Sequence, residues 1–478
     1  LDLVSDYIGK QIEAKTSIYK NDVLIEQFHS IKLDAVKDVA STSYHLENLG
    51  TSSDDWILGS SLENDLFVAS EGDDYFDGGS QKDILMYHFG WKGSDLSENI
   101  RIEASFVDQT VKKFDDDVLI GTDTFNNIEA IHGSEKNDII FGDDRANFIY
   151  GAGGDDTLIG NGGHDTVDGH EGNDNIFGGD GNDRIMSSIG TKAIDGGEGI
   201  DTVSYFNRNN VNFAKIEINL MNNEVTKFST NIEKDTINSV EWFDINTISD
   251  VKFIGSDLDA SVRVIQSNLF VQGGDGMERM NIFDALADIE FGGGDDRISI
   301  TSTEVFEAGL VALNVSSELQ VGTLEEIELD GKIRLDAVLD GNEGSDTVIL
   351  NDKGVAFFLH DAYSAFHESA ELSSDSAGRQ SAQRINYVEN IFMSDGDDII
   401  DLTSPDYSLA GQDIKVDAGG GNDTLWGSDA NETLHGGDGK DALFGGVGIN
   451  ELIGGSGADE FQFTRTSTND TVADFNIS

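Results

Sequence analysis

A nine-residue repeat runs through eight consecutive units of this chain, from Gly133 to Ser204. The units read GSEKNDIIF, GDDRANFIY, GAGGDDTLI, GNGGHDTVD, GHEGNDNIF, GGDGNDRIM, SSIGTKAID and GGEGIDTVS. The eighth position is aliphatic in every unit, and the sixth is Asp in six of them. A fixed period of this length indicates a solenoid, because each unit buries its apolar face only against neighbouring units.

Each unit divides into six turn residues and three strand residues. The glycines at positions 1, 2 and 4 permit backbone angles closed to other residues and leave carbonyl oxygens exposed. Two units then form one turn of a flattened parallel coil, so that units n and n+2 stack about 4.8 Å apart. In this arrangement the position-8 side chains point inward, and the position-6 aspartates stack in a column along each edge.

A column of carboxylates at this spacing repels itself. At about 5 Å and an effective dielectric constant of about 20, neighbours repel by about 3 kcal/mol. The sequence therefore predicts a cation between successive coils. Carboxylate and carbonyl oxygens in irregular geometry select Ca²⁺ over Mg²⁺, and a chain without Cys offers little to Zn²⁺. About 15–20 calcium ions would neutralise around half of the net charge, and folding of the repeats would depend on them.

The composition supports a folded polyanion. The chain carries a net charge of −61, which disfavours nucleic acid and anionic membranes as partners. Hydrophobic residues make up 38% of its 478 residues, too many for a disordered acidic chain. It has no Cys and one Pro, and it contains no apolar run long enough to insert into a membrane.

The nonapeptide recurs in separate blocks. We predict an N-terminal β-rich cap or small module, four repeat blocks of which the third is degenerate, three excursions from one continuous stack, and the start of a C-terminal region. The N-terminal part spans 1–50, the blocks 51–86, 133–204, 273–349 and 393–462, the excursions 87–132, 205–272 and 350–392, and the C-terminal region 463–478.

The excursions share a pattern. The chain re-enters the stack through FNNIEAI at 125–131, INSVEWF at 237–243 and INYVENI at 385–391. Alternating segments such as 215–225 predict β-strands within the excursions. The clearest candidate for a helix is short, at 361–372.

The candidate calcium ligands are the position-6 aspartates, together with glycines and aspartates at positions 1 and 3 of the turns. They are Asp65, Asp74, Asp83, Asp138, Gly151, Gly153, Asp156, Gly160, Gly162, Asp165, Gly169, Asp174, Gly178, Asp180, Asp183, Gly196, Asp201, Gly273, Asp275, Asp296, Gly341, Asp346, Asp398, Asp423, Gly436, Asp438, Asp441, Gly454 and Asp459. Asn147, Lys192 and Asn450 break the position-6 rule, which predicts incomplete ion sites at those turns.

The units resemble the nonapeptide GGxGxDxUx of the RTX family, and GGDGNDRIM and GGDGKDALF are near-perfect copies. The resemblance covers roughly 60–478, with gaps at the excursions. It implies an all-β, right-handed parallel β-roll, secretion by a type I system, and folding in calcium-rich surroundings outside the cell. It also implies that position-6 aspartates and nearby glycine carbonyls hold the ion, most clearly at Asp156, Asp165, Asp174, Asp183, Asp441 and Asp459. The segment DTVADFN from Asp470 resembles the lead-in to the family's C-terminal secretion region.

Catalytic motifs are absent from the sequence. HESAE at His367 lacks the second His of a zinc protease helix, and neither GxSxG nor a Walker loop occurs. We therefore expect a non-enzymatic extracellular structural protein, part of a surface layer, filament or adhesin, that contacts further copies of itself or cell-surface glycans. The alternative is the repeat-bearing part of a secreted polysaccharide-acting enzyme, a lyase, hydrolase or epimerase.

Overall fold

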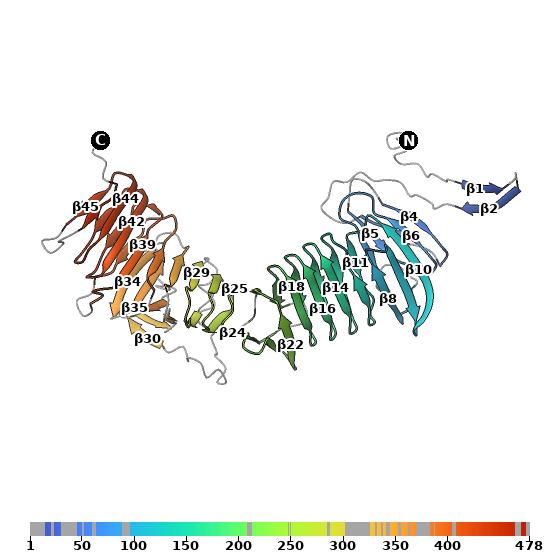
Figure 1. Ribbon diagram of the computed structural model, residues 1–478, viewed down its shortest axis with the longest axis horizontal. Helices are drawn as coiled ribbons and strands as arrows, with labels where there is room; N and C mark the ends of the chain where they lie inside the picture. The colour runs from blue at the N-terminus through green and yellow to red at the C-terminus, as the bar shows by residue number, and fades with distance from the viewer. Residues whose placement is uncertain are drawn as a thin grey trace. The chain divides into compact units, whose positions relative to one another are not determined.

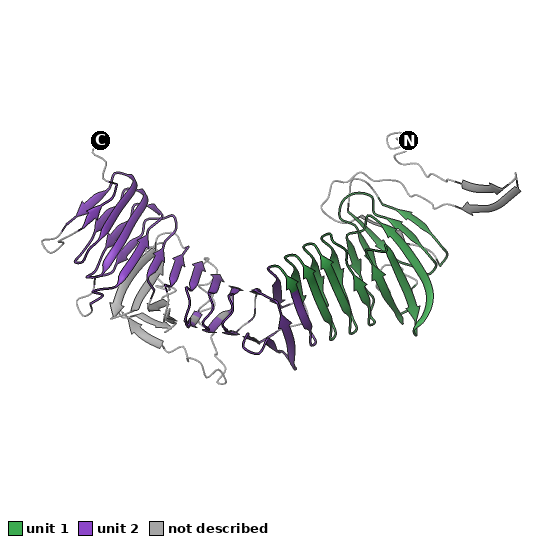
Figure 2. Ribbon diagram, viewed as in Figure 1, with its two compact units in different colours: residues 1–186, 197–199 green, residues 187–196, 200–478 purple. Residues whose placement is uncertain are grey.

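The regular structure consists entirely of β-strands in the part of the chain that the computed structural model describes (Figure 1). No helix there is long and apolar enough to cross a membrane. The described residues are 15–20, 23–29, 45–49, 52–59, 64–87, 96–207, 213–246, 248, 250–283, 287–301, 326–329, 332–335, 338–340, 345–351, 355–361, 364–369, 383–386, 388–403, 408–463 and 470–474. The chain divides into two units, 1–186 with 197–199 and 187–196 with 200–478 (Figure 2).

Two sheets face each other in the first unit, and the chain alternates between them. Sheet I contains only parallel pairs, in the order β3 (His45–Leu49), β5 (Asp65–Val68), β7 (Ile84–Met86), β11 (Ala130–His132), β13 (Phe148–Tyr150), β15 (Thr166–Asp168) and β17 (Arg184–Ser187). Sheet II has the order β4 (Trp56–Leu58), β6 (Tyr75–Asp77), β10 (Val118–Asn126), β9 (Thr110–Asp115), β8 (Ile100–Ser105), β12 (Ile139–Phe141), β14 (Thr157–Gly162) and β16 (Asn175–Asp180).

The second unit repeats this plan. Its sheet I has the order β19 (Thr202–Phe206), β23 (Trp242–Asn246), β25 (Ala260–Ile265), β27 (Glu278–Phe283), β29 (Arg297–Thr301), β33 (Thr347–Leu350), β37 (Asn390–Phe392), β39 (Asp413–Asp417), β42 (Asn431–Gly439), β44 (Glu451–Gly457) and β46 (Thr471–Val472), and β40 (Gly420–Gly421) also pairs with β42.

Sheet II of the second unit has the order β18 (Ala193–Glu198), β22 (Ile232–Asn238), β21 (Glu224–Phe228), β20 (Lys215–Asn219), β24 (Asp250–Ile254), β26 (Asn268–Gln272), β28 (Ala287–Glu290), β32 (Val338–Asp340), β36 (Gln383–Asn386), β35 (Ser364–Ser369), β34 (Val355–Asp361), β38 (Ile399–Asp401), β41 (Thr424–Trp426), β43 (Ala442–Phe444) and β45 (Glu460–Gln462). Two separate antiparallel hairpins are β1 (Lys15–Lys20) with β2 (Val23–His29), and β30 (Glu326–Leu329) with β31 (Lys332–Leu335).

The predicted coil of two nonapeptides is confirmed by the strand register. Ile140 pairs with Leu158, and Leu158 pairs with Ile176, so each step along sheet II advances by 18 residues. The position-8 column forms the core, and Ile140, Leu158 and Ile176 are all fully buried. Position 8 points inward because it is the middle residue of a three-residue strand, flanked by residues that face the other way.

The glycines of the turn have two different roles. Positions 2 and 4 have positive φ, as at Gly179 (115°) and Gly181 (133°), which is why Gly is favoured there. The expectation that position 1 also needs an unusual φ is wrong, because Gly160 and its equivalents are not left-handed. At position 1 the missing side chain provides space instead, since a Cβ on Gly160 would overlap Oδ2 of Asp165 and the carbonyl oxygen of Gly178.

The described strands of the three predicted excursions remain within the stack. Each contributes a three-stranded antiparallel meander to sheet II: β8–β9–β10, β20–β21–β22 and β34–β35–β36. In each case the last strand pairs in parallel with the preceding coil, and the first strand pairs in parallel with the following one. The chain therefore enters each meander at the strand farthest along the sheet. It returns through two antiparallel pairings to the strand beside the preceding coil, and then continues in sheet I.

One sequence-based boundary and one expected helix are corrected by these pairings. Residues 242–272, assigned to an excursion, form β23 to β26 and belong to the stack. The step of 18 residues continues there, with Val251 opposite Leu269, although the glycine-rich turns that mark a nonapeptide are missing. The helix expected at 361–372 is wrong, because residues 364–369 form strand β35 between two antiparallel neighbours.

The core column predicts a clear mutational contrast in β16. Replacing the buried Ile176 by Ala should lower the free energy of unfolding by about 2–5 kcal/mol, because it leaves a cavity between stacked coils. Replacing the neighbouring Phe177, which is 43% exposed, should change it far less. Urea unfolding at saturating calcium measures both values, and equal losses would contradict this assignment of the core.

Candidate metal centres

The position-6 carboxylates form columns along both edges of the coil. One oxygen of each carboxylate accepts a hydrogen bond from the peptide N–H of the position-6 residue one coil earlier. The N–H of Asn147 donates to Oδ1 of Asp165 at 2.7 Å, and the N–H of Asp165 donates to Oδ1 of Asp183 at 2.7 Å. In the second unit the N–H of Asp423 donates to Oδ1 of Asp441 at 2.9 Å. This contact holds each carboxylate in a fixed orientation.

The other oxygen of these carboxylates lacks a hydrogen-bond donor. It is Oδ2, and in the described part of the chain it is buried and accepts no hydrogen bond in Asp83, Asp165, Asp296, Asp346, Asp423 and Asp441. An ionised carboxylate buried in this way is strongly unfavourable unless a positive charge lies beside it. The arrangement therefore requires either a proton or a cation at each coil.

Space and ligands for a cation exist at the same place. Around the vacant Cβ position of Gly160 lie Oδ2 of Asp165 and the carbonyl oxygen of Gly178, one coil further on. Oδ2 of Asp441 lies in the same place beside Gly436. No three His, Cys, Asp or Glu side chains converge on one point anywhere in the described ranges, so main-chain carbonyls must supply further ligands. An all-oxygen set of this irregular kind suits Ca²⁺, which accepts 6–8 oxygens.

Burial is the main reason why these sites need a positive charge. It raises the pKa of Asp165 from 3.8 to about 7, and the hydrogen bond from Asn147 opposes that rise. Repulsion by Asp183 is a smaller cause. Burial also raises the pKa of Asp346 and Asp423 to about 7. Repulsion along the column, from which the sequence alone predicts a cation, raises the pKa of Asp165 less than loss of solvation does.

Most predicted position-6 residues lie in these columns. The buried ones are Asp65, Asp74, Asp83, Asp138, Asp156, Asp165, Asp174, Asp183, Asp201, Asp296, Asp346, Asp398, Asp423 and Asp441, and Asp459 is half-buried in the last coil. The three position-3 aspartates, Asp180, Asp275 and Asp438, are exposed and lie outside the columns. Gly341 lies outside the described residues. Metal binding by the individual residues stays a prediction.

Two of the three exceptions at position 6, Asn450 and Lys192, bring a donor to the turn. Nδ2 of Asn450 donates to the carbonyl oxygen of Gly445 at 2.6 Å and to Oδ1 of Asp470 at 3.0 Å. Nζ of Lys192 donates to the carbonyl oxygen of Ile189 at 2.7 Å. At the third exception, Oδ1 of Asn147 lies beside the Cβ position of Gly142, as Oδ2 of Asp165 lies beside Gly160. Incomplete ion sites at these turns stay a prediction.

Three glutamates of the re-entry segments also belong to the columns, although the nonapeptide pattern does not indicate them. Oε2 of Glu129 accepts from the N–H of Asp83, Oε2 of Glu241 from Asp201, and Oε2 of Glu389 from Asp346, each at 2.9 Å. Each lies in a re-entry segment, two residues before a residue that pairs with a position-8 residue of the preceding coil. The signal was present, since FNNIEAI, INSVEWF and INYVENI share this Glu.

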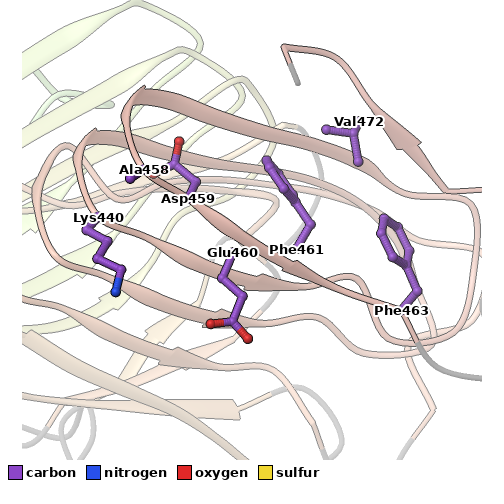
Figure 3. A pocket seen from close by; sticks show the side chains of 7 residues that line it. All are labelled: Lys440, Ala458, Asp459, Glu460, Phe461, Phe463 and Val472. Carbon is purple, nitrogen blue, oxygen red and sulfur yellow. The ribbon is translucent and has the colours of Figure 1, made fainter. Parts of the chain in front are cut away.

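In the described part of the chain, the apolar core is only partly covered at the last coil. Figure 3 shows a pocket there, lined by Lys440, Ala458, Asp459, Glu460, Phe461, Phe463 and Val472. Phe461 pairs with Leu443 and Val472 pairs with Leu452, so both continue the position-8 column. They are half-buried, whereas Leu443 and Leu452 are fully buried. Among the described residues, this pocket therefore lies where the position-8 column is only partly covered.

Removing one orphaned oxygen should shift stability in opposite directions with and without calcium. Asp165→Asn keeps the Oδ1 acceptor but removes a buried charge. We expect it to stabilise the chain in EDTA and to weaken stabilisation by calcium, with one calcium ion fewer bound. Asp180→Asn, on an exposed side chain, is the matched control. Thermal unfolding and metal analysis measure both effects, and identical behaviour of the two variants would contradict the site.

The raised pKa values predict the pH dependence. In the absence of metal, a carboxyl with a pKa of about 7 when folded and near 3.8 when unfolded favours the folded state most below about pH 4. That contribution is lost as the pH rises through about 7. We therefore expect the chain in EDTA to be more stable at about pH 5 than at about pH 8, and its calcium affinity to be lower at pH 5 because protons compete. Calcium titrations followed by circular dichroism test this, and a pH-independent midpoint would refute it.

Comparisons with known proteins agree with this geometry. The family model described as RTX calcium-binding nonapeptide repeat (4 copies) matches residues 49–85, 132–167, 159–191, 168–203, 415–443 and 435–462. No curated protein sequence matches the chain. The matched regions include the turns that carry Asp74, Asp165 and Asp441. The chain therefore contains RTX nonapeptide repeats, and these repeats bind calcium.

Proposed function

We propose that this chain is an extracellular structural protein, a calcium-stiffened scaffold of a surface layer, filament or adhesin. It is exported by a type I system and folds when it meets calcium outside the cell. The observation that carries this proposal is that the carboxylate columns recur in both units, from β5 and β6 near the start to β43 and β46 near the end. Calcium then determines the fold of the chain rather than one local site.

Export before folding follows from the same carboxylates. Without calcium, the buried columns oppose folding at neutral pH, so the chain stays extended where calcium is scarce. Outside the cell, calcium sites of modest affinity fill at millimolar concentrations. Binding to the folded state alone then stabilises it by mass action, and the contributions of many sites add. The net charge of −61 also keeps unfolded chains apart before calcium neutralises it.

The meanders supply surfaces for lateral association. The hairpin between β9 and β10 exposes three consecutive aliphatic side chains, Val118 (63%), Leu119 (53%) and Ile120 (47%). The second meander exposes Met221 (74%) and Ile232 (68%) at its hairpins. Exposed aliphatic groups at turns are costly in an isolated chain and favour contacts with another surface. Further copies of this chain are the partner that we propose for them.

A non-catalytic role is supported by the residues of the stack and by the strand that contains His367. The stack is built from repeated turns and strands, and most of its position-6 carboxylates share a buried environment. His367, the first residue of HESAE, lies in strand β35, whereas a zinc protease motif requires a helix. A polysaccharide-acting enzyme is the alternative that the experiment below distinguishes.

Calcium-dependent folding and assembly can be measured on one preparation. Calcium added to the metal-free chain should increase the β-sheet signal in circular dichroism, and ordered sheets or filaments should then appear by electron microscopy. Leu119→Asp should fold with calcium but fail to assemble, whereas Val447→Asp, on an exposed turn of the second unit, should do both. Monomers that depolymerise a polysaccharide would instead support the enzyme. A spectrum that calcium leaves unchanged would overturn the proposal.

A further inference from the structure

A buried lysine lies between two coils at the first meander. Nζ of Lys113, on β9, is 2.6 Å from Oδ1 of Asp123 and donates to the carbonyl oxygens of Ser70 at 2.8 Å and Gly72 at 2.7 Å. Its side chain is 1% exposed. Ser70 and Gly72 occupy positions 2 and 4 of the nonapeptide turn 69–74. The ammonium therefore lies among turn carbonyls and a column carboxylate.

Asp123 belongs to the carboxylate column although it lies in the meander. It precedes Phe125 by two residues, and Phe125 pairs with Phe76, a position-8 residue. Its Oδ1 accepts from the N–H of Asp74 at 2.9 Å, as Oδ1 of Asp165 accepts from Asn147. Asp123 is thus the position-6 residue of its coil.

Neither Asp74 nor Asp123 has a buried carboxylate oxygen without a hydrogen-bond partner. The hydroxyl of Tyr87 donates to Oδ2 of Asp123 at 2.7 Å, and the hydroxyl of Ser70 donates to Oδ2 of Asp74 at 3.0 Å. Nζ of Lys113 also lies 3.9 Å from Oδ2 of Asp74. Groups of the chain itself therefore satisfy both carboxylates, in contrast to Asp165.

The second meander reproduces this arrangement. Nζ of Lys227, on β21, is 2.8 Å from Oδ1 of Asp235 and donates to the carbonyl oxygens of Ser188 at 2.7 Å and Gly190 at 2.6 Å. Ser188 and Gly190 are again positions 2 and 4 of a nonapeptide turn, 187–192. Lys227 and Asp235 are both fully buried.

Hydroxyl groups complete the second cluster as well. Oδ2 of Asp235 accepts from the hydroxyl of Ser187 at 2.6 Å and from that of Tyr205 at 3.2 Å. Its Oδ1 accepts from the N–H of Lys192 at 2.8 Å, which is the contact that Asp123 receives from Asp74. The same Lys, Asp and Tyr thus recur in two meanders that are more than 100 residues apart.

The third meander changes all three residues together. Lys113 and Lys227 each pair with the residue of the first meander strand that lies two residues before the point where this strand contacts the core column of the following coil. In the third meander the register places Ser369 at this position. Gln383 stands in place of Asp123 and Asp235, two residues before the pairing with the preceding coil. Leu350 stands in place of Tyr87 and Tyr205. The lysine is therefore present where the position-6 carboxylate is present and absent where it is absent.

We propose that the ammonium groups of Lys113 and Lys227 occupy the place of calcium at these two coils. The turn 69–74 with Asp123, and the turn 187–192 with Asp235, then bind no calcium ion and keep their structure without one. An ammonium carries one positive charge and three donors, which match two carbonyl oxygens and one carboxylate oxygen. The first two meanders are thus calcium-independent joints within a calcium-dependent stack, from which the repeats on either side fold when calcium arrives.

The test converts a lysine site into a calcium site. Lys113→Ala removes the ammonium and leaves Asp74 and Asp123 facing a vacant space. The full-length variant should bind one more calcium ion per chain than the wild type, measured by metal analysis after dialysis. In EDTA its strands β8 to β10 should lose hydrogen-exchange protection, and calcium should restore that protection. Lys112→Ala, on the exposed neighbouring side chain, should match the wild type in both measurements.

Further measurements keep the proposal open to refutation. Lys113→Ala combined with Asp123→Asn should not gain the additional ion, because one carboxylate is lost. In the wild-type chain in EDTA, β8–β10 and β20–β22 should stay protected while the repeat strands within 139–186 exchange. Unchanged stoichiometry in Lys113→Ala, with protection that calcium fails to restore, would show that the lysine is only a core ion pair. Uniform loss of protection in the wild type would also overturn the proposal.

Discussion

A buried carboxylate oxygen without a hydrogen-bond donor controls the stability of each repeat coil. Withdrawing an ionised carboxylate from water costs several kcal/mol even after relaxation. The apolar side chain that the same nonapeptide buries contributes about 1.5–3 kcal/mol. The core alone therefore cannot offset the carboxylate, and a bound cation must supply the difference. This balance explains how an ordinary-looking aliphatic core can depend on a metal ion at neutral pH.

The period of the sequence predicted the parts of the fold that depend on local geometry. Strand positions, the inward column of Ile140 and its equivalents, and the 18-residue coil all follow from alternation within a nine-residue unit. The order of strands in the meanders does not follow from it, because pairing between distant segments decides which strand lies beside which coil. The erroneous helix at 361–372 has the same cause, since strand pairing overrode a weak local preference.

The sequence predicted the candidate sites only in part, because the repeat identifies the carboxylates but not the atoms that surround them. Position 6 of the nonapeptide identified the carboxylates. Only the structure shows that the glycine at position 1 leaves space for Oδ2 and a neighbouring carbonyl oxygen. Without coordinates, charge repulsion appeared to be the dominant effect, and burial proved larger. Glu129, Glu241 and Glu389 escaped because they lie in segments without glycine turns, although their coils place them in the same column.

The coils next to the meanders show how the same electrostatic requirement can be met in different ways. Ordinary turns leave an oxygen for a cation, Asn450 places an amide there, and Lys113 and Lys227 bring an ammonium. In every case a positive or donating group lies beside a buried oxygen. The choice between them sets which coils respond to calcium and which do not. The first two meanders therefore differ from the repeat coils in their dependence on calcium.

The most direct test is a crystal structure of the chain grown with calcium, with anomalous diffraction data collected at long wavelength. We predict anomalous peaks beside Oδ2 of Asp165 and Asp441, within coordination distance of main-chain carbonyl oxygens. We predict no peak beside Nζ of Lys113 or Lys227. Peaks only at exposed aspartates such as Asp180 and Asp438, with none in the carboxylate columns, would contradict this prediction.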